Sequence, residues 1–407
     1  MRGQNDQMGR GREWAPWLRN RWGARRTLLL HLSCAAMGLL TLTKLGSEFY
    51  RLVWETGVKG AIDLKLLREF TLDWFSGIPV YERFAFANYP PATAPLLWPL
   101  LGWLDLPAAR ALWAFTSVLA MLWLVWLMVR ASNANTRLGA TFVALMCLSM
   151  NALGVTIGNG QLALHILPPL LAAILLLRQP RREWGKDLLV AGLLVWALVK
   201  PSLLLPFFWV VLFLPGGWRP AFLTAAAYLA LTLFAASFQD AALPTLLQGC
   251  VARGVAAAGG GYGNIQTWLA TLGLHEWTFP AMLAVLAGCG AWVYRHRHDD
   301  LWKLLGVAAI IARLWAYHRK YDDLLILLPM VTLFRIAKRG PLPHDHDVWA
   351  GLLLAITIAA MLLPARLRFA PAPWSWPFTV GHVLVWVVVL IFLLQPEYAP
   401  DTQERRT

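Results

Sequence analysis

The chain has 407 residues, of which 58% are hydrophobic and 14% are charged, with a mean hydropathy of +0.53. Soluble domains carry about 25% charged residues, so this composition excludes an ordinary soluble protein. Most apolar residues come in blocks of about 17–25, the length of a helix that crosses a bilayer, and runs such as VLVWVVVLIFLL do not alternate as β-barrel strands do. We therefore predict an all-α polytopic membrane protein.

The net charge of +14 marks membrane topology rather than nucleic-acid binding, because the basic residues lie mostly in short loops. Residues 1–26 contain seven arginines, and no A-x-A-like cleavage site cleanly follows the next apolar run. We expect 1–26 to be a cytoplasmic tail, 27–395 to be a single transmembrane domain and 396–407 to be a second cytoplasmic tail.

Basic loops are expected to face the cytoplasm. Four stand out, at 130–137, 178–186, 295–300 and 335–340, and the shorter 215–220 fits the same side. Threading helices between these loops predicts about twelve spans. They are placed near 27–45, 107–129, 138–156, 161–178, 187–200, 202–215, 219–237, 278–295, 301–317, 322–336, 348–364 and 378–395.

The outer face then receives long loops at 46–106, 238–277 and 366–378. The apolar segment 90–104 lies in the first of them and contains four prolines. If this segment spanned the membrane, the basic loop 130–137 would lie outside. We therefore expect it to form an interfacial or re-entrant element.

A helix is predicted over 61–77, because this stretch lacks proline. Its apolar face is formed by Leu66, Leu67, Phe70 and Trp74. Asp63 lies in the same arc, and a carboxylate on an apolar face needs a partner or a function. Two interpretations stay open: a first-turn acid stabilised by the helix dipole, and a functional acid.

Three polar motifs follow between predicted spans. GNGQ (158–161) is either a simple turn or, through Gln161, a site for a polar ligand. In VKPS (199–202), Lys200 either snorkels to the interface or presents its ammonium to a phosphate. The glycine-rich stretch 259–270 has neither Walker nor Rossmann spacing, so we do not expect it to bind a nucleotide; a helix is expected near Gln266.

The strongest signal is YHRKYDD (317–323), which places five ionisable residues between two apolar runs. Charges near a membrane are costly, and they usually pair or form a site. One interpretation is an internally neutralised cluster that joins two helices. The other is an anion site formed by Arg319, Lys320 and a His318 that titrates near neutral pH.

No metal site is expected. His344, Asp345 and His346 in PHDHD (343–347) resemble a metal-binding tract, but no second ligand pair accompanies them. The four cysteines show no metal-ligand spacing, and we expect them to be small apolar residues. Cys250 is the one cysteine expected outside a helix.

The order of these motifs resembles a known family. GIPVY (77–81) and YPP (89–91) precede GNGQ and KPS, and then come GNIQ (263–266) and the histidine–tyrosine–aspartate run before LLILLP. Over roughly residues 30–340 this order is similar to the bacterial glycosyltransferase family 87, which includes polyprenyl-phosphate-mannose-dependent mannosyltransferases. The resemblance implies a GT-C-like fold and a multi-pass protein of the bacterial inner (plasma) membrane, with interfacial helices in the first outer loop.

The resemblance also implies roles for individual residues. The family's catalytic aspartate in the first outer loop matches Asp63, its lysine–proline lysine matches Lys200, and its late histidine matches His318. This chain departs from the family pattern by the extra stretch LGSEFYRLVWETGVKG (45–60), so Glu48 is an alternative base.

The implied reaction moves a hexose, with mannose the family's best-known sugar, from a polyprenyl-phosphate sugar to a lipid or glycan acceptor with inversion. Asp63 would be the general base, while Lys200, Arg319 and Lys320 would stabilise the leaving phosphate. His318 would hydrogen-bond the phosphate or the acceptor, without a cofactor or metal. Asp322 and Asp323 would orient the basic groups or bind sugar hydroxyls. The remaining expected substrate-binding residues are Tyr89, Asn159, Gln161, Gln266 and Tyr321.

Two other function classes stay open. A transporter or lipid flippase would also place ionisable groups among its spans, in this chain the cluster 318–323, but such proteins usually show related halves, and no internal repeat is evident here. In a noncatalytic cell-envelope assembly protein, Asp63 and the basic loop would tolerate substitution.

Overall fold

Every regular element that the structure describes is helical. The computed structural model describes residues 14–84, 87–179, 183–257, 263–340, 345–364 and 375–395, with the single positions 342, 367 and 371. The elements are α1 (Trp14–Val53), α2 (Ile62–Phe75), α3 (Val80–Arg83), α4 (Thr93–Leu101), α5 (Leu106–Ala131), α6 (Arg137–Ser149), α7 (Asn151–Asn159), α8 (Ala163–Leu177), α9 (Trp184–Ala197), α10 (Pro201–Phe213), α11 (Trp218–Ala236), α12 (Leu243–Ala256), α13 (Ile265–Thr271), η2 (His275–Trp277), α14 (Thr278–Arg295), α15 (Leu301–Leu314), η3 (Lys320–Ile326), α16 (Leu327–Lys338), α17 (His346–Leu362) and α18 (Ser375–Leu394). The predicted all-α class is confirmed.

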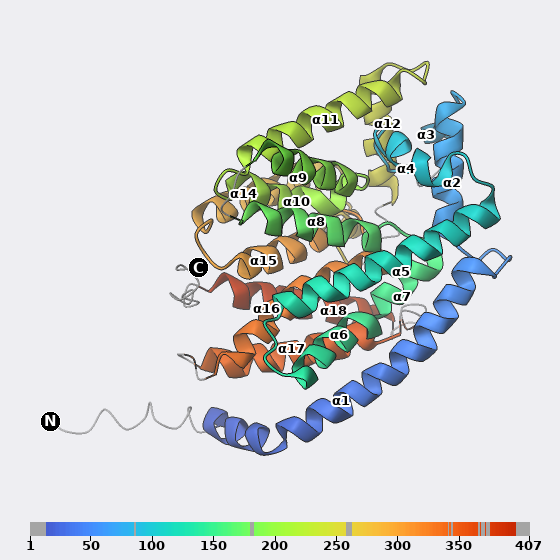
Figure 1. Ribbon diagram of the computed structural model, residues 1–407. Helices are drawn as coiled ribbons and strands as arrows, with labels where there is room; N and C mark the ends of the chain where they lie inside the picture. Colours follow the sequence, from blue (N-terminus) through green and yellow to red (C-terminus); the bar gives the residue numbers. More distant parts are fainter. Residues whose placement is uncertain are drawn as a thin grey trace.

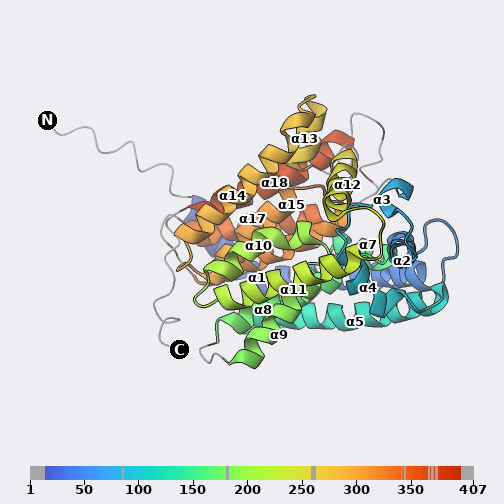
Figure 2. The same ribbon diagram turned by 90° about the horizontal axis from the view of Figure 1, so that it is seen from above.

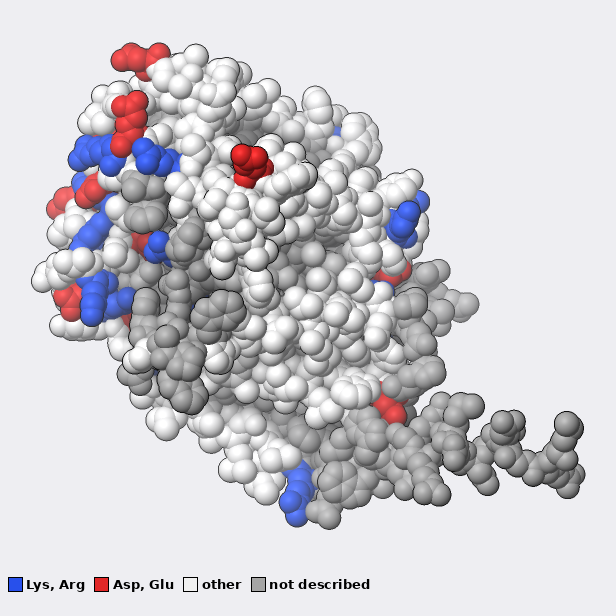
Figure 3. Space-filling view, turned by 180° about the vertical axis from the view of Figure 1, so that it is seen from behind, with Lys and Arg blue, Asp and Glu red and all other residues white. Residues whose placement is uncertain are grey.

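The long helices lie side by side and form one bundle, as Figures 1 and 2 show. Short helices gather at one end of this bundle: α2, α3, α4 and α12 lie together on the right of Figure 1, opposite the start of α1. Around the sides, large apolar side chains such as Phe115, Leu229 and Ile391 are exposed. Figure 3 shows the matching surface, with a broad uncharged middle and charges gathered toward the ends. This distribution is that of a membrane protein.

Five helices are long and apolar enough to cross a membrane: Thr27–Val53, Leu106–Ala131, Trp218–Ala236, His275–Arg295 and Pro377–Leu394. A sixth candidate is the pair α6–α7, which is bent by 48°. Helical segments lie at all twelve predicted positions, but several of them, including α8, α10 and α17, are shorter than a full span.

Three predicted boundaries were wrong. The first helix continues to Val53 rather than ending near 45, so the loop predicted to lie outside begins only after Val53. The predicted span 138–156 breaks at Met150, where α6 ends and α7 begins. The span predicted at 322–336 starts as a helix only at Leu327, because Lys320–Ile326 form the separate 3-10 helix η3. The charged residues of η3 therefore precede the helix α16.

The interior of the bundle is formed by α8, α15 and α16, which are buried along almost their whole length. Three of the predicted cytoplasmic loops meet at one end of it. Arg335 Nη1 donates to the carbonyl of Ala131 (2.6 Å), and Arg335 Nη2 lies 3.4 Å from Asp300 Oδ2. The other oxygen of Asp300 caps α15 by accepting from the backbone N–H of Trp302 (2.7 Å).

At the opposite end, the first predicted outer loop contains α2 and α4, which pack against each other. The segment 90–104 contains only the nine-residue helix α4, too short to span a bilayer. Thr93 in its first turn donates to the carbonyl of Val199 (2.9 Å). Trp74 of α2 donates through Nε1 to the carbonyl of Ala235 (2.8 Å). These two hydrogen bonds attach the outer helices to the bundle.

Two predictions about the outer helices need correction. Leu67, Phe70 and Trp74 are buried on α2 as predicted, but Leu66 is 42% exposed and Leu64 takes its place. The buried arc of α2 is thus rotated by part of a turn, because α7 covers the side that carries Leu64. Cys250 lies within α12 and not in a loop.

Helix α7 is held close to both α1 and α2 by glycines. A Cβ at Gly158 would clash with the side chains of Glu48 and Arg51 on α1. A Cβ at Gly160 would lie 2.5 Å from Leu64 Cβ, and Gly160 ends α7 in the left-handed region with φ +71°. The two glycines therefore permit the close approach that places the end of α7 beside the first turn of α2.

Gly160→Ala is expected to destabilise the protein by about 2–5 kcal/mol, because the left-handed conformation and the overpacking against Leu64 both cost free energy. Thermal unfolding in detergent, followed by tryptophan fluorescence, measures the effect. Gly192→Ala in α9 is the matched control: nothing lies within 4 Å of the added Cβ, so its Tm should be unchanged or higher. Equal Tm values for the two variants would contradict the expectation.

Candidate functional site

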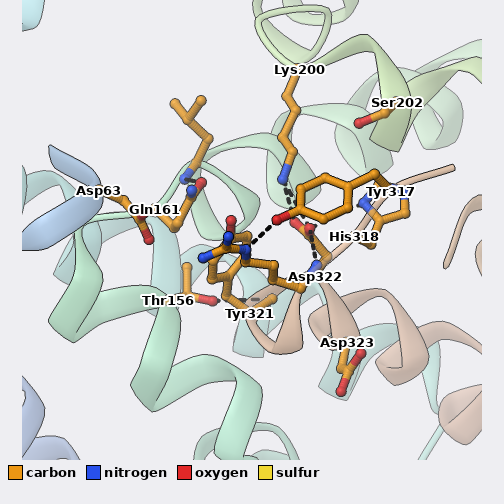
Figure 4. Close-up of polar contacts among 12 residues, drawn as sticks. Asp63, Thr156, Gln161, Lys200, Ser202, Tyr317, His318, Tyr321, Asp322 and Asp323 are labelled. Atoms are coloured by element: carbon orange, nitrogen blue, oxygen red, sulfur yellow. Dashed lines mark hydrogen bonds and ion pairs between the residues drawn. The ribbon is translucent and has the colours of Figure 1, made fainter. Parts of the chain in front are cut away.

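Polar side chains from four distant parts of the chain converge at the end that carries α2 and α4. They come from the first turn of α2, the α7–α8 turn, the α9–α10 junction and the segment between α15 and α16. Figure 4 shows this group, with Asp63 and Gln161 on one side and Lys200, His318 and Asp322 on the other. The structure thus brings together motifs that are spread along the chain from residue 63 to residue 322.

Asp322 is the centre of this group. Its carboxylate accepts two hydrogen bonds from Lys200 Nζ (2.7 and 2.9 Å), one from His318 Nδ1 (3.1 Å) and one from the backbone N–H of Arg319 (3.2 Å). Asp322 and His318 are completely buried, and Lys200 is 8% exposed. The ammonium of Lys200 also lies 4.9 Å from the centre of the Tyr321 ring.

The local sequence explains how these groups reach one another. Pro201 occupies the first position of α10, where its missing N–H costs nothing. Lys200 therefore directly precedes α10 and can extend across the end of the bundle. Asp322 lies in the first turn of η3, where its carboxylate accepts the N–H of Arg319 at the N-cap position. Thr156 of α7 also donates to the carbonyl of Tyr321 (3.2 Å), so α7 supports the same turn.

Burial and charge act in opposite directions on these groups. Burial by itself would raise the pKa of Asp322, but the nearby Lys200 and His318 outweigh it and hold that pKa well below its usual range. Burial lowers the pKa of His318, and Asp322 only partly offsets this effect. A neutral His318 donates its Nδ1–H to Asp322, which leaves Nε2 as an acceptor. Nε2 is buried and has no hydrogen-bond partner within the described residues.

Asp323 belongs to a second ion-pair cluster. Its carboxylate accepts from Arg313 Nε (2.5 Å) and lies 3.0 Å from Lys320 Nζ. Burial would raise the pKa of Asp323, but Arg313 and Lys320 lower it below its usual range. Arg313 lies over the Trp386 ring, with 4.7 Å from its Cζ to the ring centre. Lys320 therefore pairs with Asp323 and not with the Asp322 group, where the sequence placed it.

Asp63 lies in the first turn of α2, which is preceded by Ala61 without a side-chain cap. One of its oxygens, Oδ2, accepts from Asn159 Nδ2 at 2.7 Å. Gln161 follows in the same motif and donates to the hydroxyl of Tyr89 at 3.4 Å. Tyr89 in turn accepts at its carbonyl from the hydroxyl of Tyr81 (2.7 Å). Asp63, Asn159, Gln161 and Tyr89 thus form one contiguous polar group.

The pKa of Asp63 is raised by burial, against the smaller lowering effects of the Asn159 hydrogen bond and of the charges of Lys200 and Arg319. The charges of these two cations therefore affect the pKa of Asp63, although Asp63 forms no ion pair with either of them within the described structure. Arg319 is oriented by a hydrogen bond from its Nε to the hydroxyl of Tyr317. A carboxylate of raised pKa beside cations can accept a proton while the cations stabilise an anion.

Two other candidate residues have no hydrogen bond or ion pair with Asp63 or Asp322 in the part of the chain that the structure describes. Gln266 is on α13, where its Nε2 donates to Met282 Sδ (2.8 Å), and none of its described contacts reaches Asp63 or Asp322. Glu48 forms an ion pair with Arg51 (2.7 Å) on α1. Residues 259–262 and His344 lie outside the described residues. Within the part of the chain that is described, no three His, Cys, Asp or Glu side chains are grouped to hold a metal ion.

Sequence reasoning missed Arg313, Tyr317 and Thr156. Arg313 carried a usable signal, because a charged residue inside an apolar run usually has a buried partner. Tyr317 stands in the YHRKYDD motif, and its contact with Arg319 is local. Thr156 carried no signal, because its contact depends on how α7 packs against η3.

The comparison with protein families bears on residues 86–337, where the chain matches the family described as glycosyltransferase family 87. No curated protein and no solved structure matches the chain. The matched region contains Tyr89, Asn159, Lys200 and Asp322, and it begins after Asp63. Because the match covers more than half of the chain, this protein belongs to glycosyltransferase family 87 and is a membrane glycosyltransferase that acts on a sugar donor and an acceptor.

Proposed function

We propose that this enzyme transfers a hexose, by family resemblance mannose, from a polyprenyl-phosphate sugar to a lipid or glycan acceptor, with inversion and with Asp63 as the general base. The observation that carries the proposal is the position of Asp63, a half-buried carboxylate that accepts a hydrogen bond from Asn159, has a raised pKa and lies within the electrostatic reach of Lys200 and Arg319. This arrangement pairs a proton acceptor with groups that bind a phosphate.

The donor phosphate would lie between Lys200, Arg319 and His318. A lysine ammonium has three N–H donors, and Asp322 accepts two hydrogen bonds from that of Lys200, so one donor is left for a phosphate oxygen. Nε2 of His318 accepts from a sugar hydroxyl when the ring is neutral and donates to a phosphate oxygen when it is protonated. Asp322 already accepts four hydrogen bonds, which favours its role in orienting the basic groups over direct binding of sugar hydroxyls.

In the proposed reaction, the acceptor hydroxyl attacks the anomeric carbon from the face opposite the phosphate. A new carbon–oxygen bond forms as Asp63 takes the hydroxyl proton. The bond between the anomeric carbon and the phosphate oxygen breaks, and its electron pair leaves with the polyprenyl phosphate. Lys200 and Arg319 stabilise the charge that grows on this leaving group.

The proposed setting is the extracytoplasmic face of a bacterial inner membrane. Residues 27–395 would form one GT-C-like domain of about twelve spans, with 1–26 and 396–407 as cytoplasmic tails. Helices α2 and α4 would be interfacial helices of the outer loop, which begins after Val53 rather than at 46 and ends near 106. This orientation is supported by the meeting of basic loops around Asp300 at the end of the bundle away from Asp63 and Lys200.

Asp63→Asn is expected to lower kcat by about 10²–10⁴-fold, because the amide keeps the shape of the side chain but cannot accept the proton. Transfer of label from radiolabelled polyprenyl-phosphate-mannose to a membrane lipid extract, in nanodiscs, measures it. Glu48→Gln is the matched control and should keep most of the activity. Full activity of Asp63→Asn together with loss in Glu48→Gln would move the base to Glu48.

The rate should depend on pH through Asp63. A base must be deprotonated, so kcat should rise as the pH increases through the raised pKa of Asp63. When the pH is lowered, the loss of activity should therefore begin at a higher pH than for an enzyme whose base is an ordinary aspartate. Lys200→Met removes a charge that lowers this pKa and should move the acid limb to still higher pH. Initial rates are measured at saturating donor over a range of pH. After each incubation the enzyme is assayed again at one reference pH, so that reversible titration of Asp63 is distinguished from irreversible inactivation. An acid limb at the usual aspartate value would contradict the expectation.

Lys200→Met is also expected to lower stability by about 3–5 kcal/mol, because it removes the main partner of a buried carboxylate. Lys200→Met with Asp322→Asn removes the unpaired charge and should recover part of the lost Tm, while the KM for the donor remains high. A double variant less stable than the single one would show that the Lys200–Asp322 pair is not the interaction that holds this turn.

A further inference from the structure

The amide of Asn159 contacts the carboxylate of Asp63 directly, with 2.7 Å between Nδ2 and Oδ2. We propose that Asn159 is a positioning residue that holds Asp63 for proton transfer, and not a ligand of the sugar as the sequence suggested. This inference rests on the proposed function, in which Asp63 is the base.

The backbone around Asn159 is built to hold it in place. Asn159 is the last residue of α7, directly between Gly158, which packs against Glu48 and Arg51 of α1, and Gly160, which packs against Leu64 of α2. Of these two contacts, the one at Gly160 joins α7 to α2, and a Cβ there would lie 2.5 Å from Leu64 Cβ. This close contact sets the position of Asn159 relative to Asp63. A ligand-binding amide would not need such a fixed distance from one carboxylate, whereas a positioning amide does.

The hydrogen bond from Asn159 gives the two carboxylate oxygens of Asp63 different roles. Oδ2 accepts the N–H of Asn159, and a hydrogen bond with Gln161 also lowers the pKa of Asp63. In this proposal Oδ1, the oxygen that Asn159 does not contact, takes the proton of an acceptor hydroxyl. An ionised carboxylate has no donor, so the amide nitrogen must face it, which sets the orientation of the Asn159 side chain.

A neutral amide suits this task better than a cation. A salt bridge to lysine or arginine would stabilise the carboxylate and make Asp63 a weak base, whereas an amide orients the group with a smaller effect on its proton affinity. Lys200 and Arg319 remain at a distance from Asp63, and Lys200 is held by Asp322. The arrangement therefore keeps the base oriented and basic at once.

Asn159→Ala tests the inference in the nanodisc assay. We expect kcat to fall by about 10–100-fold, as for other residues that orient a reacting group, with the KM for the donor within about twofold of the wild type. The acid limb of the pH–rate profile should move to higher pH, because the hydrogen bond lowers the pKa of Asp63. Lys200, Arg319, Tyr89, Tyr317, Tyr321 and Gln161 also lie near Asp63 and are left in place.

Asn151→Ala is the matched control, because Asn151 is the same residue type at the other end of α7. It contacts Lys44 and the carbonyl of Leu363 and not Asp63, so the acid limb should stay where it is. A donor KM raised by tenfold or more in Asn159→Ala, with an unmoved acid limb, would make Asn159 a sugar ligand and overturn the inference. If Asn159→Ala does not fold, Asn159→Leu fills the space and carries the same expectations.

A double-mutant cycle separates this inference from the proposed function. In the Asp63→Asn background, Asn159→Ala should cause no further loss in single-turnover transfer, because its effect passes through Asp63. Low activity of Asp63→Asn with an additive effect of Asn159→Ala would overturn the positioning role alone. Full activity of Asp63→Asn would overturn both.

Discussion

The structure depends on one constraint: a carboxylate that is completely buried must be surrounded by donors. Asp322 meets it with four hydrogen bonds from Lys200, His318 and the backbone of Arg319. These bonds connect the start of α10 to the turn before α16, and they fix the positions of the lysine and the histidine together. The same requirement is met again at Asp323, whose partners Arg313 and Lys320 join α15 to η3.

Helix α7 connects the Lys200–Asp322 cluster to Asp63. It supports η3 through Thr156, it approaches α1 and α2 through its glycines, and it ends at Asn159 on Asp63. The bend of 48° between α6 and α7 lets a chain that enters as one predicted span turn its last residues into the site. The break between α6 and α7 thus places the end of α7 at Asp63.

The two carboxylates of the site have opposite properties because their surroundings differ. Asp322 is buried among cations, which keeps its pKa low, so it remains charged and orients its partners. Asp63 is half-buried beside an amide and farther from the cations, and its pKa is raised by desolvation. Two aspartates are thereby separated into an orienting group and a candidate base, a division that environment rather than residue type produces.

Much of this could be predicted from the sequence. Long apolar runs predict helices, because a backbone buried in lipid must make its hydrogen bonds internally. Helical segments lie at all of the predicted positions. The polar motifs were found because Asp63, Lys200 and the 317–323 run interrupt apolar stretches, where an ionisable group needs a reason to be present. Such signals are local, so one sequence is enough to see them.

The pairing of these groups was decided only by tertiary structure. Lys200 and Asp322 are 122 residues apart, and composition cannot tell whether Lys200 meets Asp322 or whether Lys320 meets Asp323. Leu66 was expected to be buried because periodicity fixes an arc of α2 but not which neighbour covers it. Gln266 was expected to bind substrate, and its amide contacts Met282 on α14. Local sequence sets which side chains can form a helix or carry a charge, while the partner of each charge depends on which helix ends pack together.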